Sequence, residues 1–264
     1  MHKKTAMVKD FKKIKPPKSI NSVTIIGKNG NVSWHLQNAL SSLSISHTII
    51  SSKEALKRIE LNSNLIIIAV ADSAVEKVAK KIKSKNSILV HTSGSLDMNI
   101  LKSYAENYGV IYPLQTLSKE KQIKFSDTPL CIEGSSDETS KSLMKFSKKL
   151  SKRVSLISSD KRLKLHLAAV FCSNFINHLI GIAKEILEKE DIPAEIIYPL
   201  VIETIQKAMN NNPFEVQTGP AIREDYHIMQ THLDLLLKDE KEVYEVISSK
   251  IINRKRTKMK NTKK

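Results

Sequence analysis

The feature that most constrains this fold is an alternation of short apolar runs with helical patterns from Ser22 to about Ser158. The apolar runs are β-branched and continuous, which is typical of strands that helices cover on both faces. The alternation therefore predicts an α/β fold with a doubly wound, mostly parallel sheet. The expected strands are Val23–Ile26, Thr48–Ile50, Leu65–Val70, Ile88–His91, Val110–Tyr112, Leu130–Glu133 and Val154–Ile157.

The pattern changes after Ser158. No strand pattern follows, and long helical segments run over 160–188, 193–209 and twice between 219 and 252. We therefore expect an α/β domain over residues 21–158 and an all-helical domain over residues 159–252.

The net charge of +16 is concentrated at the two ends of the chain. Residues 1–19 carry seven lysines and one acid, and residues 253–264 carry seven lysines or arginines and no acid. The remaining 233 residues hold 29 basic and 26 acidic side chains, so the body is nearly neutral. This distribution predicts disordered basic tails over 1–20 and 253–264. Without a basic aromatic face or zinc-finger spacing, we expect no specific nucleic-acid binding.

Cysteine usage and hydropathy favour a cytoplasmic protein. Cys131 and Cys172 match neither a metal-binding spacing nor a disulfide framework, so we expect no metal. The apolar run Leu65–Ala71 is too short to span a bilayer, and the lysine-rich N-terminus lacks the apolar segment of a secretory signal. We therefore expect no membrane association.

The first candidate site is the turn within Val23–Leu36, where an apolar strand runs into two glycines and a helical pattern. Gly30–Ser33 fits the second half of the dinucleotide fingerprint G-x-G-x-x-G/A, but Lys28 stands at the first glycine position and Gly27 lies one residue earlier. The turn alone is compatible with a drifted dinucleotide site or an ordinary strand–turn–helix. The residues expected to bind a cofactor here are Gly27, Asn29, Gly30, Asn31 and Val32.

The end of the second predicted strand bears on the choice of cofactor. A NAD site usually carries an acidic residue there, whereas this chain reads Ser51-Ser52-Lys53. Hydroxyls and a lysine suit a ribose 2′-phosphate, so we expect NADP rather than NAD. The alternative is a solvated loop, which the neighbouring Glu54 supports. Val70, the last residue of the third predicted strand, and Ala71, which follows it, complete the expected cofactor site.

The second candidate site follows the strand that ends in His91-Thr92-Ser93-Gly94-Ser95. Because ligands bind at the carboxyl ends of parallel strands, we expect Ser93, and Gln115 after the next strand, to lie at the mouth of the cleft. Ser95 fits the cap of a following helix. His91 is interpreted as a cofactor-binding residue or as a core imidazole.

The third candidate site is the helical segment His166–His178. At about 100° per residue, His166, Ser173, Asn174 and Asn177 share one stripe of an otherwise apolar helix. Such a stripe lines either a wet cleft or a polar subunit interface. In the cleft interpretation His166 supplies a proton and Asn174 orients the substrate. Farther along the chain, Arg223 either holds an anionic substrate group or pairs with nearby acids.

Taken together, residues 22–252 resemble the Rossmann-like, provisionally assigned oxidoreductases whose C-terminal helical domain is of unknown function. The matching stretches are Gly30–Leu36, Val90–Ser95, Tyr112–Lys119, Leu165–Leu179 and Gln217–Asp225. The turn Gly27–Ser33 is one residue longer than is usual in that family. The resemblance implies NADP binding, kinship with 6-phosphogluconate dehydrogenase, ketopantoate reductase and pyrroline-5-carboxylate reductase, and a homodimer formed through the helical domain.

The expected function is hydride transfer between NADP and a C=O or C=N carbon of a small polar molecule. The expected catalytic residues are His166, Asn174, Ser93 and Gln115. Two alternatives stay open, since fold does not establish activity. One is a non-catalytic NADP-binding sensor or scaffold of the same fold, and the other is a polyanion-binding protein that acts through its basic tails.

Overall fold

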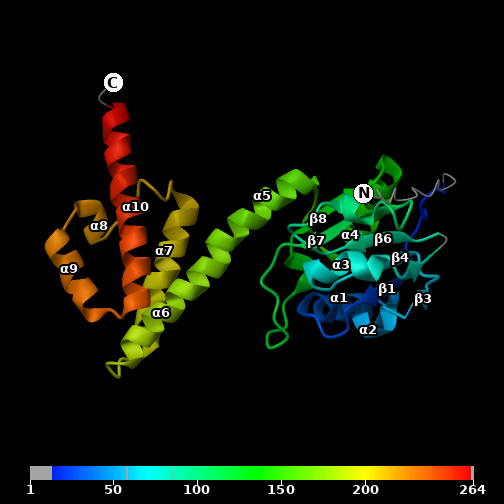
Figure 1. Ribbon diagram of the computed structural model, residues 1–264, viewed down its shortest axis with the longest axis horizontal. Helices are drawn as coiled ribbons and strands as arrows, with labels where there is room; N and C mark the ends of the chain where they lie inside the picture. Colours follow the sequence, from blue (N-terminus) through cyan, green and yellow to red (C-terminus); the bar gives the residue numbers. More distant parts are fainter. Residues whose placement is uncertain (1–13, 58, 85, 263–264) are drawn as a thin grey trace, which may run out of the picture. The chain divides into compact units, whose positions relative to one another are not determined.

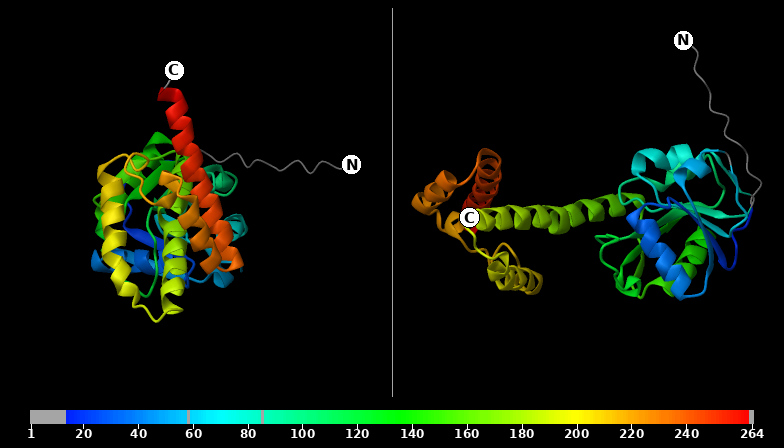
Figure 2. Two further views of the ribbon diagram at one scale, coloured as in Figure 1. Left: turned by 90° about the vertical axis from the view of Figure 1, so that its left-hand side faces the viewer. Right: turned by 90° about the horizontal axis from the view of Figure 1, so that it is seen from below.

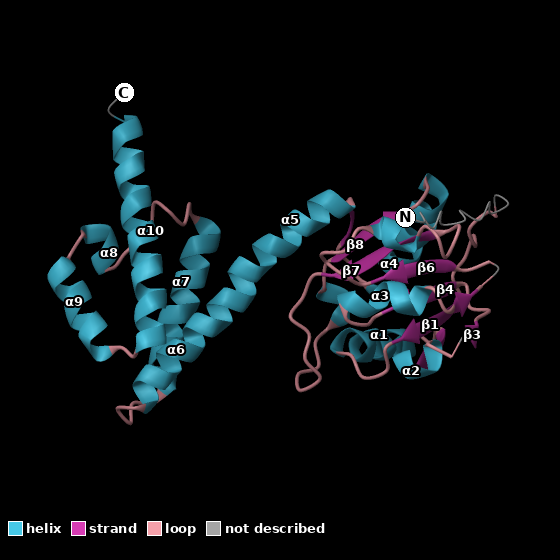
Figure 3. Ribbon diagram, viewed as in Figure 1, coloured by secondary structure: helices cyan, strands magenta, loops and turns pink. Residues whose placement is uncertain are grey.

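The computed structural model describes residues 14–57, 59–84 and 86–262 (Figure 1). The chain divides into two compact units, Met1–Phe175 and Ile176–Lys264, which are described separately below. The first unit contains a sheet flanked by helices, and the second is built from helices (Figure 3).

Seven strands of the first unit form one sheet within the described part of the chain, in the order β2-β1-β4-β6-β7-β8-β9. Neighbouring strands are parallel except for β7 and β8, which are antiparallel. The predicted α/β fold is therefore confirmed. The strands are β1 (Ser22–Ile26), β2 (Ser46–Ile50), β4 (Leu65–Ile68), β6 (Ile88–His91), β7 (Tyr108–Pro113), β8 (Leu130–Gly134) and β9 (Val154–Leu156).

A second, two-stranded sheet pairs β3 (Ile59–Glu60) with β5 (Ile82–Lys83). The sequence pattern does not reveal it, because two-residue strands are too short to show a periodicity.

Helices cover both faces of the main sheet. The helices α1 (Asn31–Ser42) and α4 (Asp137–Leu150) pack on one face, while α2 (Ser52–Ala55), α3 (Asp72–Ala79) and the 3₁₀ helix η1 (Met98–Leu101) pack on the other. The right-hand view of Figure 2 shows the blue α1 and green α4 on one side of the sheet and the cyan α3 opposite them. A second 3₁₀ helix, η2 (Phe125–Asp127), contributes Phe125 to the core beside α1.

Strand β4 shows why its sequence is continuously apolar. Leu65 and Ile67 belong to the core under α1 and α4, whereas Ile66 and Ile68 belong to the core under α3. All four side chains are fully buried, because successive side chains of a strand point to opposite faces.

The first unit ends with α5 (Ser159–Ala169) and a π-helical segment, Val170–Phe175. The compact division thus falls after Phe175 rather than at the predicted boundary of 158. The helices of the second unit are α6 (Ile176–Glu188), η4 (Ala194–Ile197), α7 (Tyr198–Asn210), α8 (Pro220–Arg223), α9 (Tyr226–Leu235) and α10 (Lys238–Thr262).

The prediction of disordered tails is wrong where the structure describes them. Near the N-terminus, Ile20 is buried and the Ser142 hydroxyl donates to the Pro17 carbonyl over 3.0 Å. At the other end, α10 continues to Thr262, the Arg254 guanidinium stacks 3.7 Å from the Phe214 ring centroid, and Arg256 pairs with Glu224. Lysine and arginine favour helices, so a high density of positive charge does not by itself indicate disorder. The predicted tail residues 1–13, 263 and 264 lie outside the described residues.

One helix in the described part of the chain, Ser159–Glu188, is long and apolar enough to cross a membrane. This finding rests on length and composition alone, and the core helices of soluble proteins can meet the same criterion. None of its most apolar window is buried within the single chain.

Candidate functional site

The turn after β1 is shaped by a glycine that no other residue can replace without strain. Gly27 has φ +126°, and a Cβ atom built on it would lie 2.1 Å from the Ala69 carbonyl oxygen. The Gly27 amide donates to the Ile50 carbonyl oxygen over 2.9 Å, which holds the turn against β2. The displaced first glycine of the fingerprint thus brings the turn close to the ends of β2 and β4.

Helix α1 begins immediately after this turn and presents unpaired amides. The first helical bond runs from the Trp34 amide to the Gly30 carbonyl over 3.1 Å, so the amides of Asn31, Val32 and Ser33 lack acceptors among the described residues. The buried Ser33 hydroxyl likewise has no partner there. Unpaired amides at the positive end of a helix dipole are suited to bind a diphosphate.

A cavity of about 370 Å³ is lined by Asn31 and Val32 and lies at the carboxyl ends of β1, β2 and β4. Strand order runs from β1 to β2 in one direction and from β1 to β4 in the other, and this switch point is where doubly wound sheets bind ligands. Most of the predicted cofactor residues line it, joined by Lys28, Ala69 and Thr92. The lining residues predicted from the sequence are Gly27, Asn29, Gly30, Asn31, Val32, Ser51, Ser52, Val70 and Ala71.

Two predicted cofactor residues are not among the lining residues of this cavity, namely Lys53 and His91. The His91 side chain is fully buried, and its Nδ1 accepts the Ser93 amide over 3.2 Å. Burial, with a smaller contribution from the Arg162 charge, lowers the pKa of His91 to about 4. His91 is thus a neutral core imidazole, the alternative interpretation of this residue.

The loop after β6 is held by a carboxylate at the start of α3. The Asp72 carboxylate accepts hydrogen bonds from the hydroxyls of Ser93, over 2.9 Å, and Ser95. The Ser93 oxygen in turn accepts the amides of Ser95 and Leu96 over 3.1 and 3.0 Å. Ser93 is buried and its hydrogen-bonding groups are occupied, so in this structure it shapes the loop rather than offering a reactive hydroxyl.

A tyrosine–histidine pair stands beside this loop. The Tyr112 hydroxyl lies 3.1 Å from His166 Nδ1, and the two rings meet edge to face with centroids 6.0 Å apart. A Cβ atom on Gly94 would lie 2.7 Å from His166 Nδ1 and 2.8 Å from Tyr112 Cζ, so the glycine allows the close approach. Burial raises the pKa of Tyr112 above its ordinary value.

A buried ion pair anchors the helix that carries His166. The fully buried Arg162, one turn before His166, donates to the Glu133 carboxylate on β8 over 2.7 Å and to the Leu96 carbonyl. Ser159, at the start of α5, donates to both Glu133 oxygens through its amide, over 2.9 Å, and its hydroxyl, over 2.6 Å. This network places α5 against the loop after β6 and explains why the compact first unit extends beyond residue 158.

Comparison with known proteins places these features in context. A domain of unknown function, DUF2520, matches residues 128–251. The chain is similar to BF3122 of Bacteroides fragilis, provisionally named an NADP oxidoreductase, with 31% identity over 89% of this chain and 98% of that one and a TM-score of 0.80. The chain belongs to the same family as this protein.

Other solved structures share the fold of this chain at lower sequence identity. Protein TM1727 of Thermotoga maritima is 18% identical, with a TM-score of 0.65 and coverage of 90% of this chain and 99% of that one. The NADP-bound pyrroline carboxylate reductase of Plasmodium falciparum is 12% identical, with a TM-score of 0.50 and coverage of 91% and 98%. No curated protein matches the chain. The DUF2520 match begins before β8, so it extends beyond the helical domain to which the resemblance assigned the unknown function.

The structure of this chain does not bring all four predicted catalytic residues to one place. Gln115 is exposed, and its Oε1 accepts the amide of the next residue, Thr116, over 2.9 Å. Asn174 is exposed in the π-helical segment. Because a π-helix has more residues per turn than an α-helix, the stripe drawn at α-helical spacing does not hold, although π segments often mark functional sites. The roles of both residues stay predictions.

Arg223, at the end of α8, forms an ion pair with neither of its adjacent acids, Glu224 and Asp225, within the described residues. Glu224 pairs instead with Arg256 over 2.6 Å and Lys255 over 3.4 Å, and Arg223 makes no ion pair within the described ranges. The alternative in which Arg223 pairs with an adjacent acid therefore finds no support.

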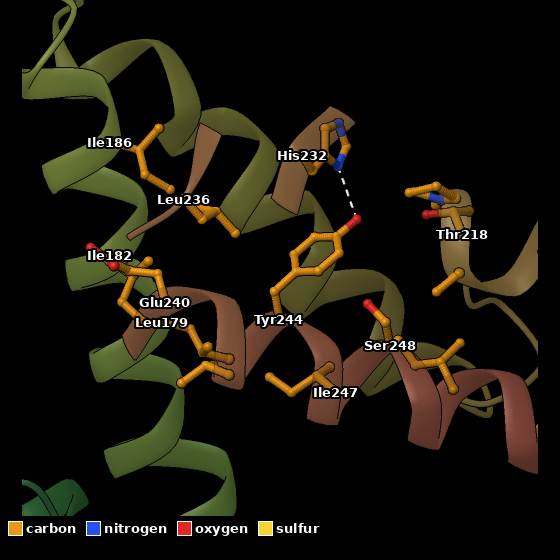
Figure 4. Close-up of a pocket in the computed structure, with 15 residues that line it drawn as sticks. Leu179, Ile182, Ile186, Thr218, His232, Leu236, Glu240, Tyr244, Ile247 and Ser248 are labelled. Carbon is orange, nitrogen blue, oxygen red and sulfur yellow. Dashed lines mark hydrogen bonds between the residues drawn. The ribbon is translucent and has the colours of Figure 1, made fainter. Parts of the chain in front are cut away.

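The second unit contains a cavity of about 340 Å³ (Figure 4). Its walls are mainly aliphatic side chains of α6 and α10, and Figure 4 shows the Tyr244 hydroxyl directed at His232 Nδ1, 2.9 Å away. The cavity also includes the turn Thr218–Ala221, part of one family motif. This mainly aliphatic lining differs from that of the cavity beside Gly30, which is formed largely by the turn and the start of α1.

Proposed function

We propose that this protein is an NADP-dependent oxidoreductase that acts on a C=O or C=N carbon of a small polar molecule. The observation that carries the proposal is the set of unpaired amides at the start of α1, where Asn31 and Val32 line a cavity of about 370 Å³ at the switch point of the sheet. When bound, the coenzyme supplies or accepts the hydride. The protein has to bind it, orient the substrate and supply a proton.

Tyr112 and His166 are the residues we propose for proton transfer. Reduction of a carbonyl or imine requires a proton at the oxygen or nitrogen, and a positioned acid supplies it. The Tyr112 hydroxyl and His166 Nδ1, 3.1 Å apart, can share that proton, and both side chains are only half-buried. We place His166 in contact with the substrate and Tyr112 as its hydrogen-bonding partner.

NADP rather than NAD is supported by charge and by the relatives. Lys28, on the turn itself, lines the cavity and supplies the positive charge that the sequence analysis expected from Lys53. The Bacteroides fragilis relative carries an NADP oxidoreductase name, and the Plasmodium falciparum structure contains NADP.

The two described cysteines are free, in keeping with the expected reducing compartment of the cytoplasm.

The first test is thermal denaturation with NADPH, with NADH and without a ligand. A coenzyme at 100 times its Kd stabilises the folded state by about 2.7 kcal/mol, so we expect NADPH to raise Tm by several degrees and NADH to raise it less. A screen of carbonyl and imine compounds then follows the loss of NADPH absorbance. If NADPH raises the Tm but no compound oxidises NADPH, the protein is a sensor or scaffold rather than an enzyme. If deletion of residues 1–19 and 253–264 abolishes the binding of NADPH, the protein is a polyanion-binding protein.

The proton-transfer assignment predicts a separation of binding from turnover. With a substrate from this screen, His166→Gln should lower kcat by about 100-fold, because the general acid is lost, while the Kd for NADPH stays unchanged. Tyr112→Phe should lower kcat less and shift the pH profile of the reaction. An unchanged kcat in His166→Gln contradicts the assignment.

We also propose a homodimer that covers the exposed apolar helices. Leu163, Leu167, Phe171 and Phe175, on the last helical stretch of the first unit, are between 48% and 61% exposed in the single chain. Exposed patches of this kind usually mark interfaces. The same stretch carries Ser173 and Asn174, which a protein partner can hydrogen-bond and the interior of a bilayer cannot.

Light scattering after gel filtration tests the dimer. Wild-type protein should have twice the chain mass of 29.7 kDa, and Phe171→Asp should shift it to the monomer by placing a charge in the apolar interface. Leu156→Asp, a matched change at a 61% exposed leucine on β9, should leave the dimer intact. A wild-type monomer at every concentration, or a requirement for detergent, would contradict this proposal.

A further inference from the structure

A carboxylate is hydrogen-bonded to Ser51, one of the residues that line the proposed coenzyme cavity. Ser51 directly follows β2, and Glu54 lies three residues later on α2. The Ser51 amide and hydroxyl both donate to Glu54 Oε2 over 2.7 Å, and the Glu54 amide donates to the Ser51 hydroxyl over 3.2 Å. This reciprocal arrangement is a capping box.

The capping box occupies the groups on which the expectation of a phosphate site rested. Ser51 lines the cavity together with Ser52, but the Ser51 amide and hydroxyl already donate hydrogen bonds to Glu54. A ribose 2′-phosphate that used the Ser51 groups would have to displace the carboxylate from them. It would also meet a like charge, since the hydrogen bonds from Ser51 hold the pKa of Glu54 below its ordinary value.

A ribose with a free 2′-hydroxyl can interact favourably with the same carboxylate. A hydroxyl can donate to a carboxylate oxygen, and Glu54 Oε1 has no hydrogen-bond partner among the described residues. A phosphate dianion has no proton to donate there. The carboxylate therefore discriminates against the 2′-phosphate both by charge and by hydrogen-bonding capacity.

We infer that the Ser51–Glu54 capping box is the coenzyme-selectivity element of this protein, in which Glu54 opposes the 2′-phosphate. The inference rests on the proposed binding of a nicotinamide coenzyme. Lys28 acts in the opposite direction, because it lines the cavity with a positive charge close enough to Glu54 to stabilise the carboxylate. The preference for NADPH over NADH then depends on two opposing charges. Lys28 increases the preference for NADPH, and Glu54 reduces it.

Calorimetric titration of the full chain with NADPH and NADH tests this inference. Glu54→Gln keeps a side-chain oxygen that can accept both Ser51 hydrogen bonds but removes the charge. We expect the variant to bind NADPH about tenfold more tightly and NADH equally or more weakly, since only NADPH carries the 2′-phosphate. Glu60→Gln, which makes the same change of charge at the exposed end of β3, should leave the ratio of the two Kd values unchanged.

The outcomes separate the inference from the proposed function. Binding of both coenzymes with an unchanged or reduced preference for NADPH in Glu54→Gln overturns the inference and leaves the proposed function standing. Absence of binding by either coenzyme, to wild type and to Glu54→Gln alike, overturns both. Lys28→Gln gives an independent check, because loss of the opposing charge should reduce the preference for NADPH.

Discussion

Replacing Gly27 with alanine should lower the free energy of unfolding by about 3 kcal/mol and abolish coenzyme binding. Gly27 has φ +126°, a conformation that residues with a Cβ atom rarely adopt. The added methyl carbon would also lie 2.1 Å from the Ala69 carbonyl oxygen, so β1 and β4 would have to separate at their carboxyl ends. The loss of binding follows because Gly30 and the free amides of α1 come immediately after this turn.

Urea unfolding of wild type and Gly27→Ala measures this effect. Gly181→Ala is the matched control, because a Cβ atom at Gly181, inside α6, meets no atom within 4 Å. The control should be neutral or more stable by up to about 1 kcal/mol, since alanine is the better helix former. Equal unfolding midpoints for wild type and Gly27→Ala would show that the turn tolerates a side chain and would contradict the account of the site.

Replacing Arg162 with methionine should destabilise the first unit by about 3–5 kcal/mol. The Arg162 side chain is 1% exposed, and its loss leaves the largely buried Glu133 carboxylate without its cation. Because Arg162 also holds α5 against Leu96, the variant should lose the placement of His166 beside Tyr112.

A double-mutant cycle in urea checks this prediction. Adding Glu133→Gln to Arg162→Met removes the unpaired charge and should recover part of the lost stability. Arg256→Met, which breaks an ion pair on the surface between Arg256 and Glu224, should change the unfolding midpoint little. If Arg162→Met unfolds at the wild-type midpoint, the pair does not anchor α5.

Much of the first unit can be predicted from the sequence because its signals are local. The continuous apolar runs identify the seven strands of the main sheet, and the runs of the inner strands, such as β4, are buried between two helical layers. The glycines of the turn identify most of the cavity wall, because the carboxyl ends of parallel strands meet at one edge. The ends of the chain were mispredicted, because a charge count does not reveal contacts such as that of Arg254 with Phe214.

The parts of the site that escaped prediction depend on tertiary contacts. Tyr112 reads as an ordinary strand residue, and its partner His166 lies 54 positions away. Asp72 meets Ser93 and Ser95 only after the sheet has formed. The Glu54 contact differs, because Ser51-Ser52-Lys53-Glu54 is a local capping-box sequence, and that pattern could have assigned Glu54 to Ser51 in advance.

The central claim is that the backbone amides after Gly30 hold the diphosphate of a nicotinamide coenzyme. Amide proton–nitrogen correlation spectra of isotope-labelled protein, recorded during a titration with NADPH, test it most directly. The account predicts that the signals of Asn31, Val32 and Ser33 move the most, with smaller changes at Ser51 and Thr92. Spectra unchanged by NADPH and by NADH, or changes confined to the helical unit, would contradict it.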